Sequence, residues 1–294
     1  MRNSEEVRTE ELRKAGLEKV RSEEYAAAIA LYDEALSICT DEDQTELLTI
    51  NKADAMIALN LNGREVQLLP TILMRRRNLH HVLLAAYALM YKFRMLGDVK
   101  RAIFYGEVAL GAAVEADNPV WKIGVLNDLG IVSEMDSQFE KAIDYLESGR
   151  ALLGSIVDDS ERERNEAAIT QNLAYNKMLA GQTVEGVRLM HDVLDRIQSP
   201  SGRADAYIEL CYGYLDLEKY EEAAYYGEIG LELATNEREI RNAHYLVGEA
   251  AYKAGDIASA ERHFDELAKF YPEFRSLKSL LFAIDLRAMV NFRL

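Results

Sequence analysis

The sequence predicts an all-α fold, a right-handed α-solenoid of about seven helical hairpins followed by a C-terminal capping helix. Three observations support this prediction. A small residue returns at steps of 37, 37, 44 and 40 residues and then of 74 residues, which are the lengths of one and of two helical hairpins. Glycines suited to end a helix precede several expected turns. Only four prolines occur, so few helices are interrupted. The recurring small residues are Ala260, Ala223, Gly186, Ala142, Ala102 and Ala28.

The most regular hairpin lies between residues 245 and 272. Gly248 and Ala260 are small at positions where two helices are expected to approach closely. Gly255 is expected to end the first helix in the left-handed conformation. A glycine within the first helix, an alanine four residues before Phe264 and a proline after the second helix are typical of tetratricopeptide repeats. The whole chain therefore resembles the tetratricopeptide repeat family, with repeats longer than the usual length of about 34 residues.

The first two hairpins differ in how clearly the sequence marks them. The first is expected from about Ser4 to Cys39, with its turn near residues 22–24. The step of 74 residues indicates that a second hairpin with a weak motif follows it. Asn62-Gly63 is expected to form the turn of this hairpin, which places Leu68 at the recurring small-residue position. Pro70 is expected to kink or shorten the second helix at the preceding residue.

The remaining hairpins are expected to follow without a domain boundary. The third spans about residues 79–115, and the fourth begins at Pro119, because proline is favoured in the first turn of a helix. We expect one continuous domain, in which residues 1–272 form the repeat solenoid and residues 273–294 form its capping helix. Apolar residues on several faces of this last segment also favour a homodimer or a partner contact there.

Composition excludes several classes of protein. The formal charge of −16 disfavours binding to nucleic acid, because neutralising phosphates needs a basic face. No apolar run is long enough to cross a bilayer, and the N-terminus lacks the apolar run of a secretory signal. The two cysteines, Cys39 and Cys211, lie far apart in the expected stack and are typical of thiols in a reducing compartment. We expect an acidic, cytoplasmic protein without a nucleic-acid or membrane partner.

Motifs for chemistry are absent from the sequence. It has no phosphate-binding glycine loop, no paired-cysteine motif and no His-Glu-x-x-His run, so we expect no catalytic residue, no cofactor and no metal site. The one concentration of positive charge is Arg75-Arg76-Arg77, followed by His80-His81. Cations at the end of a helix stabilise it through the helix dipole. The alternative is a site for a phosphate or an acidic partner.

The resemblance implies a binding groove. In tetratricopeptide proteins the first helices of the hairpins line a concave groove that usually receives an extended peptide or a partner helix. Tyrosine, asparagine and glutamine at such positions suit a bound backbone, because they combine a large contact face with hydrogen-bonding groups. The positions of this sequence that match the inward positions of the family are Tyr87, Tyr91, Arg94, Asn127, Glu134, Gln171, Tyr175, Tyr212, Asn242, Tyr245, Glu249 and Tyr252.

The sequence therefore favours a non-catalytic adaptor or scaffold that binds a protein or peptide segment in the concave groove. Two alternatives stay open. One is a peptide-responsive regulatory sensor that acts through a partner protein, since the repeats begin almost at Met1 and leave no room for a DNA-binding domain before them. The other is a homodimeric structural scaffold joined by the C-terminal helix.

Overall fold

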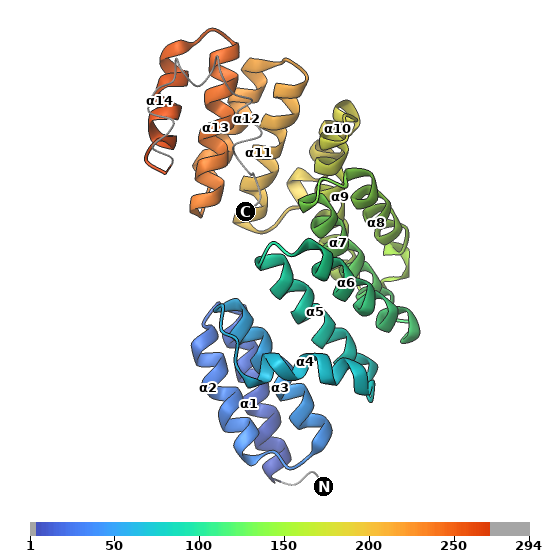
Figure 1. The fold of residues 1–294 in the computed structure, drawn as a ribbon. Helices are drawn as coiled ribbons and strands as arrows, with labels where there is room; N and C mark the ends of the chain where they lie inside the picture. Colours follow the sequence, from blue (N-terminus) through green and yellow to red (C-terminus); the bar gives the residue numbers. More distant parts are fainter. Residues whose placement is uncertain (1–3, 271–294) are drawn as a thin grey trace. The chain divides into compact units, whose positions relative to one another are not determined.

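The computed structural model describes residues 4–270 (Figure 1). This part of the chain contains fourteen α-helices and two short 3-10 helices and no strand, so the predicted all-α fold is confirmed. The α-helices follow one another in the order expected of seven consecutive hairpins. They are α1 (Ser4–Arg21), α2 (Tyr25–Ile38), α3 (Glu42–Ala58), α4 (Arg64–Arg75), α5 (Leu79–Met95), α6 (Val99–Glu115), α7 (Pro119–Met135), α8 (Phe139–Ala151), α9 (Asp159–Leu179), α10 (Thr183–Val193), α11 (Pro200–Asp216), α12 (Tyr220–Leu233), α13 (Glu237–Lys253) and α14 (Ile257–Leu267), with η1 (Leu153–Ser155) and η2 (Leu194–Arg196) after α8 and α10.

Glycines end three of the first helices, as predicted. Gly97, Gly181 and Gly255 follow α5, α9 and α13 with φ angles of 68°, 80° and 85°. This left-handed conformation carries no steric penalty in glycine because it lacks a Cβ atom. The chain thereby reverses direction within a few residues and returns as the second helix.

The recurring small residues lie where two helices approach closely. Each is the fourth residue of a second helix, in α2, α6, α8, α10, α12 and α14. All six are buried. The neighbouring backbones leave little room, as Gly186 shows: a Cβ atom there would lie 2.5 Å from the carbonyl oxygen of Ala174. The repeat period therefore reflects helix packing.

The second hairpin departs from the prediction in two respects. Leu68 is 36% exposed, whereas Leu69 is fully buried, so the placement of Leu68 at the small-residue position is wrong. The reason is that α4 buries Val66, Leu69 and Ile72, a face with a different phase from that of the other second helices. In addition, α4 continues past Pro70 to Arg75, so the proline does not end the helix at Leu69.

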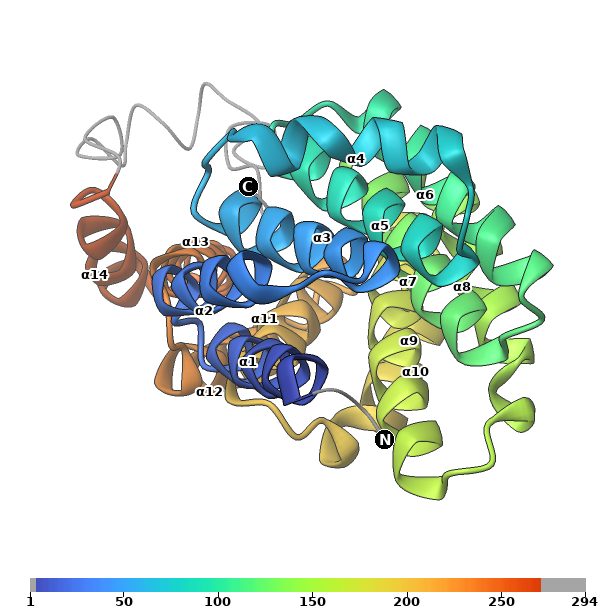
Figure 2. The same cartoon turned by 90° about the horizontal axis from the view of Figure 1, so that it is seen from below.

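The structure divides into two compact units, Met1–Asp136 and Ser137–Leu294. In the first, α1, α2 and α3 lie side by side (Figures 1 and 2), and α4, α5, α6 and α7 follow in contact with their neighbours. One cluster of buried side chains around Leu12, Tyr32 and Leu48 joins α1, α2 and α3. A second cluster around Leu69 and Leu89 joins α3 to α7.

The second unit is built in the same way. From α8 to α14 each helix packs on the next one, and α11 also packs on α13. Its largest buried cluster contains Ile208, Cys211, Tyr245, Leu246 and Phe264. The single continuous domain over residues 1–272 stays a prediction, and the capping helix over residues 273–294 lies outside the described residues.

Candidate functional site

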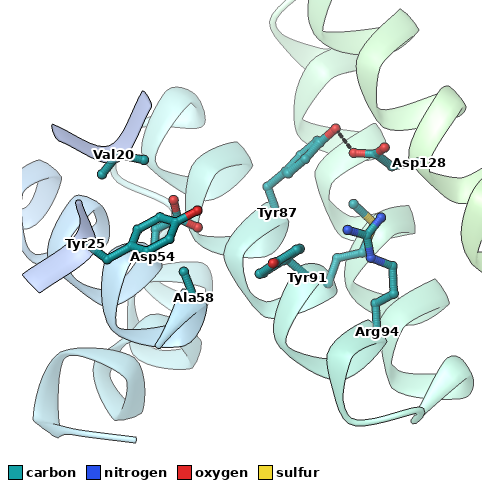
Figure 3. Close-up of a pocket in the computed structure, with 9 residues that line it drawn as sticks. Val20, Tyr25, Asp54, Ala58, Tyr87, Tyr91, Arg94 and Asp128 are labelled. Carbon is teal, nitrogen blue, oxygen red and sulfur yellow. Dashed lines mark hydrogen bonds between the residues drawn. The ribbon is translucent and has the colours of Figure 1, made fainter. Parts of the chain in front are cut away.

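A pocket of about 340 Å³ opens in the first unit (Figure 3). Its walls come from the end of α1, the start of α2 and the three first helices α3, α5 and α7. On α5, Tyr87 and Arg94 each stand three or four positions from Met90 and Tyr91, so these side chains share one face of the helix. We call this the N-terminal pocket, and it is lined by Val20, Tyr25, Asp54, Ala58, Tyr87, Met90, Tyr91, Arg94 and Asp128.

Tyr87 and Asp128 form the inner wall of the N-terminal pocket. The Tyr87 hydroxyl donates a hydrogen bond to the Asp128 carboxylate (Figure 3), and its oxygen lies 3.2 Å from the carbonyl oxygen of Gly124. Burial raises the pKa of Asp128, while the bond from Tyr87 and the positive charge of Arg94 oppose this rise. Burial, reinforced by Asp128, holds the pKa of Tyr87 well above its usual value. Tyr87 therefore stays a neutral donor at physiological pH.

Asp54 and Arg94 stand on opposite sides of the same pocket (Figure 3). The Arg94 guanidinium lies over the ring of Tyr91, 5.0 Å from its centroid, which is a cation–π contact. Within residues 4–270 no carboxylate forms an ion pair with Arg94, and no donor bonds to the Asp54 carboxylate. The Asp54 side chain is exposed to solvent, and the protein around the carboxyl removes only part of its hydration, which raises its pKa.

A smaller pocket of about 20 Å³ lies in the second unit, on the first helices α9, α11 and α13. Here the charged groups pair with one another. The Arg238 guanidinium donates to both carboxylate oxygens of Asp205 at 3.0 and 2.8 Å, and the Gln171 amide donates to Glu209 at 3.3 Å. We call this the C-terminal pocket, and it is lined by Tyr175, Asp205, Ile208, Glu209, Tyr212, Arg238, Asn242 and Leu246.

Comparison with known proteins shows the fold. No known family profile and no curated protein matches the sequence. Among solved structures, the apo form of RapI covers 96% of this chain and 83% of its own at 12% identity, with a TM-score of 0.69. A Rap protein complexed with competence and sporulation factor covers 91% and 78% at 15% identity, also with a TM-score of 0.69. A signal transduction ATPase with a tetratricopeptide repeat sensor, from Pyrococcus horikoshii, covers 89% and 42% at 13% identity, with a TM-score of 0.71.

A tetratricopeptide repeat protein from Parabacteroides merdae is also similar, with a TM-score of 0.57 at 13% identity over 89% of this chain and 92% of that one. This chain has the tetratricopeptide-repeat fold. The solenoid resemblance that the motifs indicated is therefore confirmed at the level of the fold. Most residues that line the two pockets lie on the first helices of hairpins.

The pockets gather half of the residues predicted for the tetratricopeptide groove. The N-terminal pocket contains Tyr87, Tyr91 and Arg94, and the C-terminal pocket contains Tyr175, Tyr212 and Asn242. Two more stand beside a pocket residue. Asn127 has its amide nitrogen 3.5 Å from Asp128, and Gln171 bonds to Glu209.

The other four predicted groove residues lie outside both pockets. Tyr245 has no exposed surface and packs in the core of the second unit, so we treat it as a packing residue. Glu134 and Glu249 are buried, and Glu249 forms an ion pair with Lys253, with 3.2 Å between its Oε1 atom and the Lys253 Nζ atom. Tyr252 is half-buried against the same core cluster as Tyr245.

Several pocket residues were not predicted from the sequence. Arg238, Asn242 and Leu246 stand at intervals of four, so the helical face of Asn242 could have indicated the other two. Asp128 follows the predicted Asn127 directly. Asp54 gave no such indication, because it lies in the hairpin with the weak motif.

The basic cluster makes contacts within the first unit. Arg76 pairs with Glu115 and Arg77 pairs with Glu42. The His80 ring stacks on Trp121, with centroids 5.1 Å apart. The contacts of Arg76 and His80 link neighbouring hairpins, and that of Arg77 lies within the second hairpin, so they support the interpretation that the cluster serves the fold.

Within residues 4–270 no three His, Cys, Asp or Glu side chains are placed to hold a metal ion. None of the helices that the structure describes is long and apolar enough to cross a membrane.

Proposed function

We propose that this chain is a non-catalytic adaptor that binds a protein or peptide segment on the first helices of its tetratricopeptide hairpins. The observation that carries the proposal is the recurrence of one kind of pocket. Each unit has a pocket on its first helices, and each pocket combines tyrosine rings with carboxylates and a guanidinium. Rings supply contact area at low entropic cost, and the polar groups fix orientation.

The structural neighbours support binding as the role of such a fold. One is a Rap protein in complex with competence and sporulation factor, and another carries a tetratricopeptide repeat sensor. The peptide complex and the sensor role of these neighbours favour a second candidate for this chain, a sensor that responds to a peptide and acts through a partner protein. The adaptor and the sensor would use the same binding face. They differ in that peptide binding to a sensor alters its action on a partner protein, whereas an adaptor only holds its partner.

The proposal includes the cytoplasm as the location of the protein. Cys39 and Cys211 are free thiols, and Cys211 is fully buried. Burial raises the pKa of the Cys211 thiol far above its usual range, so it is an unreactive packing residue.

A homodimer through residues 273–294 is also proposed. The homodimer would be abandoned if deleting this segment left the number of chains per particle in solution unchanged.

Affinity capture from native extract tests the adaptor. The bait is the intact chain beside a double variant, Tyr91→Ala with Tyr212→Ala, which removes one ring from each pocket. The matched control is Tyr225→Ala on α12, whose side chain is 63% exposed and lines neither pocket. Circular dichroism first establishes that all three proteins are helical.

We expect a specific protein to be retained by the intact chain and by Tyr225→Ala and to be lost from the double variant. Equal retention by all three would show that binding does not use the pockets. A conformational or activity change in a captured partner on addition of a peptide would favour the sensor over the adaptor.

A further inference from the structure

The two pockets differ in how their charges are satisfied. In the C-terminal pocket, Arg238 and Asp205 neutralise each other through two hydrogen bonds, and about 20 Å³ of space is left. In the N-terminal pocket, Asp54 and Arg94 face the cavity from opposite sides (Figure 3) and about 340 Å³ is left between the walls. In the C-terminal pocket the protein itself supplies both members of an ion pair. In the N-terminal pocket it supplies neither a cation to pair with Asp54 nor a carboxylate to pair with Arg94.

Asp54 is an uncompensated carboxylate. It hydrogen-bonds to no donor within residues 4–270, and its raised pKa is caused by lost hydration alone. Its side chain is exposed to solvent at the pocket wall, so the cost of this lost hydration is small, and the carboxylate is open to a ligand. A ligand cation placed beside Asp54 would remove that penalty, and the ring of Tyr25 next to it offers a face for the same cation.

Arg94 is held in a defined place and forms no ion pair within residues 4–270, although its charge acts on Asp128. Its contact with the Tyr91 ring fixes the guanidinium before any ligand arrives, so less side-chain entropy is lost on binding. A guanidinium presents two parallel N–H donors that match a carboxylate. The Asp128 carboxylate instead accepts hydrogen bonds from Tyr87 and from Asn127.

A ligand with a single charge fits this pocket poorly. The lining carries two carboxylates and one guanidinium. A cation alone would be attracted by Asp54 but would leave Arg94 without a ligand group, and an anion alone would meet Arg94 but be opposed by Asp54 and Asp128. A ligand that carries both charges meets a partner at each side.

This inference rests on the proposed function and narrows it. We propose that the N-terminal pocket binds a dipolar part of its ligand, with the cationic group against Asp54 and the carboxylate against Arg94. Its volume is within the range of about 300–1,000 Å³ that is usual for ligand pockets. Two sources present this chemistry: a basic and an acidic side chain of one segment, or the free ends of a short peptide.

Synthetic peptides of defined charge test the inference on the full-length protein. The first series is acetyl-Lys-(Ala)n-Glu-amide with no, one or two alanines, since each residue lengthens an extended peptide by about 3.3–3.6 Å. In matched peptides, norleucine replaces the lysine, glutamine replaces the glutamate, or both replacements are made. The second series consists of alanine peptides with free ends, with one end blocked and with both ends blocked. Affinity is measured by isothermal titration calorimetry.

We expect at least one doubly charged peptide to bind about tenfold tighter than its singly charged counterparts. If that peptide belongs to the first series, side chains supply the dipole, and if it belongs to the second, the chain ends do. Asp54→Asn should abolish the discrimination between lysine and norleucine, or between free and blocked amino ends, and keep the discrimination at the carboxylate. Arg94→Gln should do the reverse.

Two substitutions serve as controls. Asp144→Asn on α8 makes the same change in charge as Asp54→Asn at an exposed site outside the pocket. Arg75→Gln makes the same change in charge as Arg94→Gln, at the exposed end of α4 and outside the pocket. Neither should alter any affinity in either series.

Three results would overturn the inference. Equal affinity for neutral and doubly charged peptides would leave the groove as a peptide site and remove the dipolar requirement. Discrimination that survives in both Asp54→Asn and Arg94→Gln would place recognition elsewhere. Failure of every peptide to bind would also end it, while the adaptor proposal would stand or fall separately on the affinity capture with Tyr91 and Tyr212.

Discussion

Asp54 should reduce the stability of the protein in exchange for a binding site. Its folded pKa is raised by lost hydration above the usual value of 3.8, so the unfolded chain releases this proton more readily than the folded one. The ionised group therefore destabilises the fold at neutral pH, by an amount that its exposure to solvent keeps small. The penalty fades as the pH falls through the raised folded pKa towards the usual value. We predict that Asp54→Asn raises the melting temperature at pH 7 and that the gain disappears in acid.

Thermal denaturation followed by circular dichroism at several pH values checks this prediction. Asp144→Asn removes an exposed carboxylate that lines neither pocket, so it should give no gain. A loss of stability in Asp54→Asn at pH 7 would mean that the carboxylate has a favourable partner in the folded chain. A variant that is more stable yet binds less is typical of functional sites.

At the same scale, the sequence indicates faces of helices better than it indicates which residues on them stay accessible. The resemblance to the tetratricopeptide family placed Tyr87, Tyr91 and Arg94 on the inward face of one helix, and all three line a pocket. The same reasoning placed Tyr245 in the groove, yet the neighbouring helices cover it completely. Burial of a tyrosine depends on the residues that pack over it from other helices, and spacing within its own helix does not contain that information.

Among whole elements, two helices approach closely at Gly186 in α10. A Cβ atom there would lie 2.5 Å from both the Ala174 carbonyl oxygen and the Cγ atom of Met178. The backbone oxygen cannot turn away as a side chain can, so α9 and α10 would have to move apart. We predict that Gly186→Ala lowers the free energy of unfolding by about 1–3 kcal/mol.

Gly111→Ala is the matched control. Gly111 lies in the interior of α6, and a Cβ atom there would meet nothing within 4 Å. Because alanine is the better helix former, this substitution should stabilise the protein by about 0.5–1 kcal/mol. Urea denaturation of both variants measures the two effects. Gains in both variants would show that α9 and α10 separate without cost.

Two histidines link α13 to α14 and should make this hairpin sensitive to acid. The Nδ1 atoms of His244 and His263 are 3.1 Å apart, and the Nε2 atom of His263 lies 3.1 Å from Glu228 on α12. Burial and the charge of His263 lower the pKa of His244, while Glu266, Glu228 and Lys269 have smaller effects. Neutral rings can share one proton at this distance, but two charged rings repel.

The sign of the pH dependence follows from the lowered pKa of His244. Below about pH 6.5 the unfolded chain takes up a proton that the folded chain resists, so stability falls as the pH decreases through this range. We predict a melting temperature that drops from pH 7.5 to pH 5.5, with a smaller drop in His244→Gln. His191→Gln, on α10, should keep the slope of the unchanged protein. Equal slopes in all three proteins would exclude the histidine pair as the cause.

The elements also show why the fold was more predictable than its details. Helix order and turns follow from local chemistry, and Gly97, Gly181 and Gly255 adopt the conformation expected of them. In the second hairpin, by contrast, the spacing placed Leu68 in the interface that Leu69 occupies. Where the small residue is missing, nothing local distinguishes two adjacent leucines, and packing against α3 and α5 decides the phase of the helix.

For the whole molecule, the sequence predicts one continuous solenoid, whereas contacts divide the structure into two compact units. In a solenoid each repeat is stabilised by its neighbours, so a change in one repeat is transmitted along the stack. The only tryptophan, Trp121, belongs to α7 in the first unit. Gly186 belongs to α10 in the second. Their separation allows the continuity of the stack to be measured.

We predict that Gly186→Ala shifts the unfolding midpoint reported by Trp121 fluorescence as far as the midpoint reported by circular dichroism. Circular dichroism follows helices throughout the chain, whereas the fluorescence follows the first unit, where the indole stacks on His80. Coincident shifts require that the first unit loses stability when the second is weakened, which is the behaviour of one continuous domain. If the fluorescence midpoint stays in place while the circular dichroism splits into two transitions, the units unfold independently. The two pockets would then belong to separate domains, and binding at one would not stabilise the other.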